Sequence, residues 1–155
     1  MDDIAAELRE DNQTVSCWLI YYRERKQALE LMREEIIDAS PAPQADRVQS
    51  SRISDSTCDR AYRLIQKTAN ATDWIWCVEA ARSTLGPRKR ILLDLVQEAA
   101  TLPIAGSTKR WWGPWVQQQY YNRHGCWLSD FMIDKYWRSI VERCLVIALK
   151  KNLLK

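Results

Sequence analysis

The chain has 155 residues, 46% of them apolar, so it can bury one core and is too short for two separately folded enzymatic domains. It contains eight Trp and six Tyr, but only four Gly and five Pro. Because β-sandwiches and barrels need many tight turns, the shortage of Gly and Pro argues against both. The net charge of +3 does not by itself indicate a class of partner.

The residue types needed for most catalytic and metal sites are scarce. His124 is the single histidine, and the five cysteines form no CxxC pair, so the sequence predicts no zinc site. Phosphate-binding glycine loops and the GxSxG and HExxH motifs are absent. Cys126 is too close to His124 along the chain to form a convincing nucleophile–base pair. We therefore expect a non-enzymatic protein without cofactor or metal.

Two features bear on the cellular location. The longest uninterrupted apolar run, Cys144–Leu149, is far shorter than the roughly 20 residues that span a bilayer. Residues Met1–Glu10 lack the charged-then-apolar pattern of a secretion signal, and an odd number of cysteines does not suit a disulfide framework. We therefore expect a cytoplasmic protein with reduced thiols and no membrane association.

The charges are segregated along the chain. Residues 109–155 contain nine basic and three acidic residues, a net charge of +6, whereas the remaining 14 basic and 17 acidic residues give −3. Five of the eight Trp lie in the same basic third. This third is therefore the candidate for an anionic partner.

The predicted elements begin with an N-terminal helical arm, residues 1–38. From Thr14 to Asp38 apolar residues recur at spacings of three, four and seven, which predicts one amphipathic helix that either packs on its own domain or dimerises. Residues 39–54 are rich in Ser and Pro and are expected to form an exposed connector. Arg47 and Arg52 in it either stay solvated or contact phosphate.

Three helices are predicted in the middle of the chain. Asp55 can cap the first, which runs to about Ala69 with Ala61, Leu64 and Ile65 facing inward, and Thr72 can cap the second, which ends before Gly86. The third runs from Pro87 to about Thr101, with a basic first turn formed by Arg88, Lys89 and Arg90. This turn opposes the helix dipole, so it either binds a ligand or pairs with Asp94 and Glu98 at i,i+4.

Two more helices follow a loop over residues 102–113. Pro114 can open a short helix over residues 115–124, Gly125 can end it, and Ser129 can cap a long final helix with a wide apolar face. No segment shows period-2 alternation. The sequence predicts an all-α fold of five to six helices, a single domain over residues 1–155 with a core over 55–155 and a helix-turn-helix-like pair at 114–150.

The short helix, Gly-containing turn and longer helix have the order of a DNA-reading helix-turn-helix. In that motif the second helix enters the major groove while surrounding basic and polar groups hold phosphates. The groove-facing candidates are Ser129, Asp130, Phe131, Asp134, Lys135 and Arg138. The phosphate-binding candidates are Arg88, Lys89, Arg90, Lys109, Arg110 and Arg123.

The Trp-rich segment at residues 111–127 allows three interpretations. The indole rings either pack in the core, stack on single-stranded bases, or anchor a protein partner on the surface. The partner-binding candidates are Trp111, Trp112, Trp115 and Trp127.

The order of these parts resembles the RinA/ArpU-type phage late-gene transcription activators. The likeness is carried by the Pro/Ser connector SPAPQADRVQSSRISDSTCDRA, the string STLGPRKRILLDL, a Trp-led helix and a Ser-capped final helix. It implies a C-terminal half similar to the promoter-reading region of sigma factors, with base recognition at Ser129–Arg138 and double-stranded DNA and host RNA polymerase as partners. The spacing from Trp115 to Ser129 is longer than in the family, which indicates either a longer helix or the loss of base reading.

The sequence therefore predicts a non-catalytic phage or prophage DNA-binding transcription regulator in the cytoplasm of a bacterial host. The alternative is a phage-type inhibitor or adaptor that binds a host protein through a Trp-rich surface. A third class is a structural or packaging adaptor.

Overall fold

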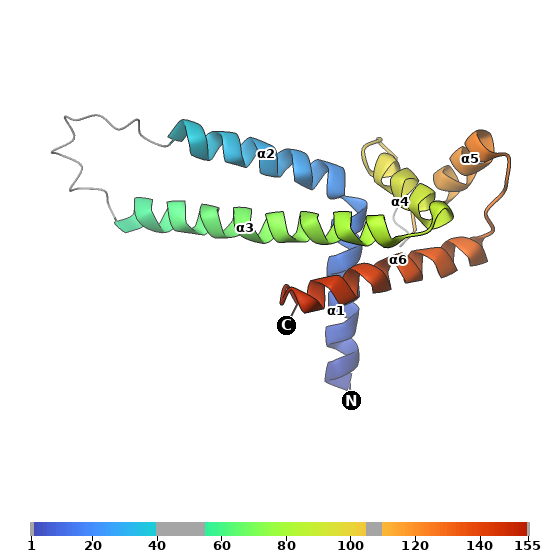
Figure 1. Ribbon diagram of the computed structural model, residues 1–155, viewed down its shortest axis with the longest axis horizontal. Coiled ribbons are helices and arrows are strands. Elements are labelled where there is room, and N and C mark those ends of the chain that lie inside the picture. The colour runs from blue at the N-terminus through green and yellow to red at the C-terminus, as the bar shows by residue number, and fades with distance from the viewer. Residues whose placement is uncertain (1, 40–54, 105–109, 155) are drawn as a thin grey trace.

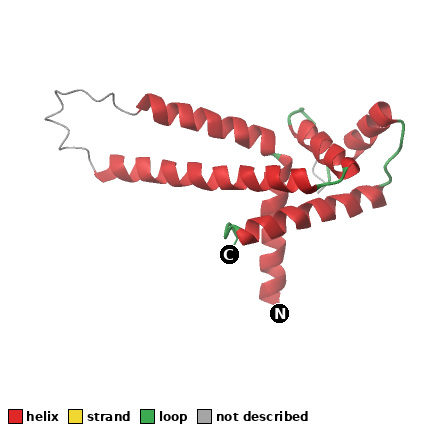
Figure 2. Cartoon of the chain, in the orientation of Figure 1, coloured by secondary structure: helices red, strands yellow, loops and turns green. Residues whose placement is uncertain are grey.

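The computed structural model describes residues 2–39, 55–104 and 110–154, and all six elements in these ranges are helices (Figures 1 and 2). They are α1 (Asp2–Ile20), α2 (Tyr22–Ala39), α3 (Asp55–Thr84), α4 (Pro87–Ala100), α5 (Gly113–His124) and α6 (Asp130–Lys150). The predicted all-α class is confirmed. The predicted connector at 39–54, with Arg47 and Arg52, lies outside the described residues except for Ala39.

The helices form a body from which a long hairpin projects (Figure 1). Helices α2 and α3 lie side by side and make the hairpin, and α1 runs across α6. Helix α4 packs on both α5 and α6, so these three helices make one subassembly at the opposite end from the hairpin tip. None of the described helices is long and apolar enough to cross a membrane.

The predicted single helix at 14–38 is wrong, because the chain bends at Tyr21 and separates α1 from α2. Hydrogen bonds from Tyr21 N–H to the Cys17 carbonyl (3.0 Å) and from Arg25 N–H to the Tyr21 carbonyl (2.9 Å) continue the helical pattern on both sides. The two parts pack on different helices: α1 runs across α6, whereas the Tyr22 hydroxyl on α2 donates to Glu79 on α3 at 2.6 Å. The bend lets the apolar stripe of α1 pack against α6 and that of α2 pack against α3.

The two helices predicted at 55–69 and 72–85 are one continuous helix, α3. Thr72 does not cap a helix, since its hydroxyl donates to the Thr68 carbonyl (2.7 Å) and accepts from Arg33 on α2 (2.8 Å). Ala61 and Ile65, expected to face inward, are exposed, and Leu64 is half-buried. Their exposure differs from the expected burial because α2 covers only one side of this part of α3.

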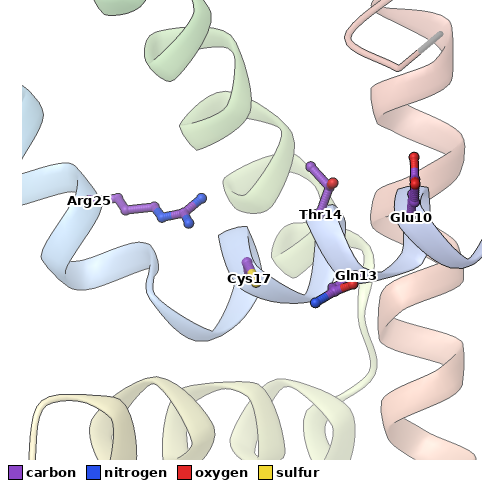
Figure 3. A pocket seen from close by; sticks show the side chains of 5 residues that line it. All are labelled: Glu10, Gln13, Thr14, Cys17 and Arg25. Atoms are coloured by element: carbon purple, nitrogen blue, oxygen red, sulfur yellow. The ribbon is translucent and has the colours of Figure 1, made fainter.

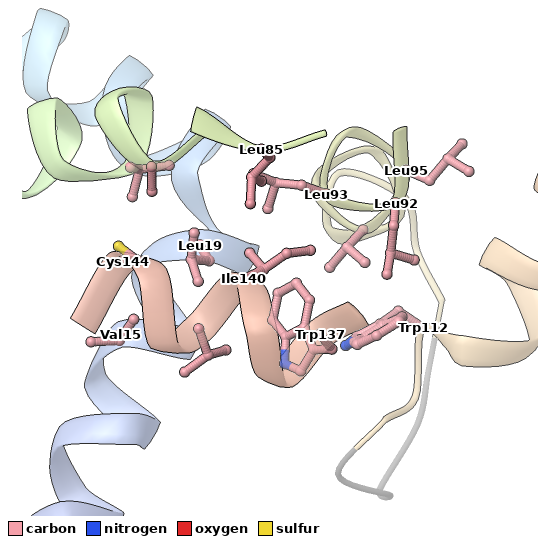
Figure 4. Packing of buried hydrophobic residues seen from close by; sticks show 14 of the residues in the cluster. Val15, Leu19, Leu85, Leu92, Leu93, Leu95, Trp112, Trp137, Ile140 and Cys144 are labelled. Carbon is pink, nitrogen blue, oxygen red and sulfur yellow. The ribbon is translucent and has the colours of Figure 1, made fainter. Parts of the chain in front are cut away.

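Most of the buried apolar residues form one cluster where α1, α3, α4, α5 and α6 meet. Trp112 and Trp137 belong to it with ring centroids 5.1 Å apart, and they lie beside Ile140 of α6 and the leucines of α4 (Figure 4). Buried Gln97 of α4 donates to the Leu19 carbonyl of α1 at 3.1 Å. The cluster fixes the orientation of α6, which carries the predicted groove-facing residues.

Candidate nucleic-acid interface

The turn between α5 and α6 has the predicted boundaries. Helix α5 opens with Gly113-Pro114 and ends at Gly125, whose φ of 69° lies in the left-handed region and whose N–H donates to the Tyr121 carbonyl at 2.9 Å. Helix α6 begins after Ser129, whose hydroxyl accepts from Met132 N–H at 3.2 Å. The long spacing from Trp115 to Ser129 therefore contains the rest of α5, up to His124, and the turn.

Gln117 of α5 holds this turn in place and was not among the predicted site residues. Its side-chain amide donates to the Leu128 carbonyl at 2.9 Å and to the Asp130 carboxylate at 2.8 Å. The side chain is nearly buried between Val116 and Tyr120, which are both core residues. In the sequence Gln117 is the first of three consecutive glutamines, so no local signal distinguished it from its neighbours. Ser129 and Asp130 are thus engaged in fixing the start of α6.

The N-terminal half of α6 presents three predicted residues to solvent. Phe131 is 72% exposed, and Lys135 and Arg138 are exposed on the same side of the helix. Neither cation forms an ion pair with a residue of the described ranges. Asp134, which would repel a phosphate backbone, pairs instead with Arg110. This half of α6 therefore has unpaired cations and a neutralised carboxylate.

The basic first turn of α4 lies against the middle of α6. Lys89 donates to the Ser139 hydroxyl at 2.8 Å. Arg88 is exposed, and the neighbouring Tyr136 hydroxyl raises the pKa of its guanidinium, so Arg88 stays charged at any working pH. Arg90 instead donates to the Leu85 carbonyl at 3.2 Å and the Ser83 carbonyl at 3.4 Å. Arg90 thus satisfies backbone carbonyls at the end of α3.

The predicted i,i+4 pairing of this turn with Asp94 and Glu98 is wrong. Asp94 accepts two hydrogen bonds from Arg82, both at 2.8 Å, so it joins α4 to α3. Glu98 accepts two from Arg123, both at 2.9 Å, so it joins α4 to α5. Arg123 lowers the pKa of the Glu98 carboxyl, and Arg82 forms an ion pair with Asp94.

The phosphate candidates therefore fall into different environments. Arg110 and Arg123 are in ion pairs, and Arg90 binds carbonyls. Lys89 binds a hydroxyl, and Arg88 is on the surface. Lys109 lies outside the described residues. Of the predicted cations in the described residues, Arg88, Lys135 and Arg138 are the ones that are exposed and in no ion pair.

The predicted Trp surface is not a continuous patch. Trp112 is buried in the core, and Trp111 and Trp115 are partly buried against it, so packing accounts for most of the indole surface. The expectation that Trp112 lies on a partner surface is wrong, since its neighbours enclose it fully. Only Trp127 of the four is exposed, at 57%, with its ring against that of Tyr121 at 6.2 Å.

Two hollows lie along α1. One, of about 410 Å³, is lined by Glu10, Gln13, Thr14, Cys17 and Arg25 (Figure 3). The Arg25 guanidinium lies 4.3 Å from the centre of the Trp18 ring, so it packs on an aromatic face. The other, of about 550 Å³, separates α1 from α6 and includes Leu8, Arg138 and Leu145.

The described residues contain no group of three or more His, Cys, Asp or Glu side chains that could hold a metal ion. His124 packs against Tyr120 on α5, with ring centroids 5.0 Å apart. The chain matches no family model, no curated protein and no solved structure.

Proposed function

We propose that the chain is a non-catalytic DNA-binding transcription regulator of the phage or prophage type, with α6 as the helix that reads duplex DNA. One observation carries the proposal: Phe131, Lys135 and Arg138 are exposed on the first half of α6. Neither of the two cations is in an ion pair with a described carboxylate, and Gln117 fixes the start of the helix. A rigidly held helix with exposed cations suits insertion into a major groove.

Arg88 supplies the phosphate contact nearest to this face. Lys89 links the same turn of α4 to Ser139 of α6, so the two basic segments lie side by side. The cations of Arg88, Lys135 and Arg138 would contact DNA, while Arg90, Arg110 and Arg123 would support the frame. The resemblance to RinA/ArpU-type activators favours the same end of the chain.

A paired comparison of double variants tests the proposal. Fluorescence anisotropy with a labelled duplex measures the affinity of the wild-type chain, of Lys135→Ala/Arg138→Ala, and of the matched variant Arg63→Ala/Lys67→Ala. Arg63 and Lys67 are exposed on α3 and are in no ion pair with the described residues. We expect the α6 variant to lose about tenfold or more in affinity and the α3 variant to lose little. Equal losses of affinity in both variants would contradict the proposal that α6 reads duplex DNA.

A second function has one observation in its favour. Trp127 and Tyr121 form an exposed aromatic pair beside the turn, and Trp and Tyr are enriched among the residues that dominate binding between proteins. Host RNA polymerase, the partner implied by the family resemblance, would bind there. Binding of purified bacterial RNA polymerase should weaken about tenfold in Trp127→Ala and stay unchanged in Trp76→Ala, a control on α3 with a similarly exposed ring. If both variants bind as the wild type does, this second function is wrong.

A further inference from the structure

The first residues of α1 form a helix end without a covering partner. All residues from Asp2 to Glu10, here called the α1 tip, are exposed, and this part of α1 extends beyond α6 (Figure 1). It forms no ion pair with another described residue. Helical segments of about 12 residues or fewer are marginal in water unless they are packed. A covering partner would therefore stabilise the α1 tip.

The composition of the α1 tip indicates the chemistry of that partner. Ile4 and Leu8 are one helical turn apart and are 72% and 53% exposed. They continue the stripe of Val15 and Leu19, which is buried further along α1. Around them stand four carboxylates and one guanidinium, from Asp2, Asp3, Glu7, Glu10 and Arg9. The partner must offer apolar side chains flanked by positive charge.

The C-terminal half of α6 has this composition. Val146 and Leu149, one turn apart, are partly exposed, and Arg143 and Lys150 are exposed beside them. Neither cation is in an ion pair within the described part of the chain. These four residues are called the α6 end surface. It lies on the half of α6 away from Lys135 and Arg138.

We propose that the α1 tip of one copy docks on the α6 end surface of a second copy, which forms a reciprocal dimer. Ile4 and Leu8 would cover Val146 and Leu149, and the carboxylates would face Arg143 and Lys150. Asp3 and Glu10 are seven residues apart, as are Arg143 and Lys150, so both charge pairs span two helical turns of about 10.5 Å. The spacing allows both ion pairs to form together.

A second copy fits better than nucleic acid or an unrelated protein. Both complementary surfaces belong to the same chain, so a two-fold pair satisfies each of them twice. Within one copy Leu8 lines the hollow between α1 and α6, whereas the first residues of α1 extend past α6 (Figure 1). The carboxylates of the α1 tip would repel DNA. The dimer leaves the first half of α6 open and does not depend on DNA binding.

Sedimentation equilibrium of the full chain without DNA tests the proposal. The weight-average mass should rise from 18.2 kDa towards twice that value as concentration increases. Leu8→Glu should weaken the dimer at least about tenfold. Leu31→Glu is the matched control, since Leu31 is 55% exposed on α2 and should leave the dimer intact. Far-UV circular dichroism checks that each variant keeps its helices.

Charge reversal identifies the surface that receives the α1 tip. Asp3→Lys/Glu10→Lys and Arg143→Glu/Lys150→Glu should each weaken the dimer, and all four changes in one chain should restore it. A wild-type mass of 18.2 kDa at every concentration would overturn the proposal. So would a dimer that survives Leu8→Glu, an equal effect of Leu31→Glu, or no recovery in the fourfold variant. None of these results would bear on DNA binding by Lys135 and Arg138.

Discussion

At the scale of single residues, the start of α6 depends on Gly125, Ser129 and Gln117. The roles of the first two can be predicted from the sequence, and the role of Gln117 cannot. Gly125 and Ser129 act locally: one adopts a left-handed conformation and the other caps a helix, and both roles follow from residue type and position. Gln117 acts across the turn, so its role depends on the packing of α5 beside Leu128. Pattern alone does not predict such a contact.

Gly125→Ala should destabilise the fold by about 1 kcal/mol, because a Cβ in the left-handed region clashes with its own backbone. No neighbouring atom would touch that Cβ, so the cost is conformational. Urea denaturation measures it. Gly113→Ala is the control, since Gly113 is helical with open space around it and should be neutral or slightly stabilising. A neutral Gly125→Ala would mean that the turn does not need this conformation.

Cys144 should be inert to thiol reagents, whereas Cys126 should react. Burial raises the pKa of the Cys144 thiol to about 12, so at pH 8 only about one molecule in ten thousand holds the reactive thiolate. Cys126 is exposed. When the protein is labelled with a chromogenic disulfide, the fast phase of the reaction should disappear in Cys126→Ser and remain in Cys144→Ser.

Cys144 should also make the stability of the fold depend on pH. Because folding raises the pKa of the Cys144 thiol, its contribution to stability falls as the pH rises from about 9 towards 12.

At the scale of elements, the sequence predicted the bounds of α4, α5 and α6 and both ends of α3, but it missed the break between α1 and α2 and the continuity of α3 across residues 69–72. Pro114, Gly125 and Ser129 are strong local signals, and the structure uses all three. The bend at Tyr21 carries no Pro or Gly, and it arises because α1 and α2 pack on different helices. Thr72 resembles a cap but bonds within α3 and to Arg33, which lies 39 residues away in the chain.

Gln117→Leu should release the start of α6 and destabilise the fold by about 1–2 kcal/mol, because it leaves the Leu128 carbonyl without this donor. The adjacent Gln118 provides the control: it is exposed and donates only to Asn122 on its own helix. Thermal unfolding should show a clear drop for Gln117→Leu and almost none for Gln118→Leu. Equal melting temperatures would show that Gln117 does not hold the turn.

The pairing of α2 with α3 should depend on one of two neighbouring leucines. Leu29 is buried towards α3, whereas Leu31 is more than half exposed. Leu29→Ala should cost about 2–3 kcal/mol through the cavity it leaves, and Leu31→Ala less than about 0.5 kcal/mol. Urea denaturation distinguishes them. A similar loss for both would mean that α2 does not face α3 through Leu29.

At the scale of the whole molecule, the division of charge along the sequence becomes a division of surfaces. The acidic part of the chain supplies the α1 tip, and the basic third supplies α6, whose two halves present different cations. The surplus of Trp is mostly structural, since Trp112 and Trp137 anchor the core that fixes α6. The number of cations was evident from the sequence, but internal ion pairs and hydrogen bonds leave only some of them for a partner.

DNA reading by α6 is tested most directly by the affinity of the full chain for duplex DNA as a function of salt. The three cations Arg88, Lys135 and Arg138 would each displace counterions from the DNA and together give a slope of about −2.7 in log affinity against log salt. The affinity should then fall about forty-fold between 50 and 200 mM salt. Affinity that does not fall as salt rises would contradict a DNA-reading α6.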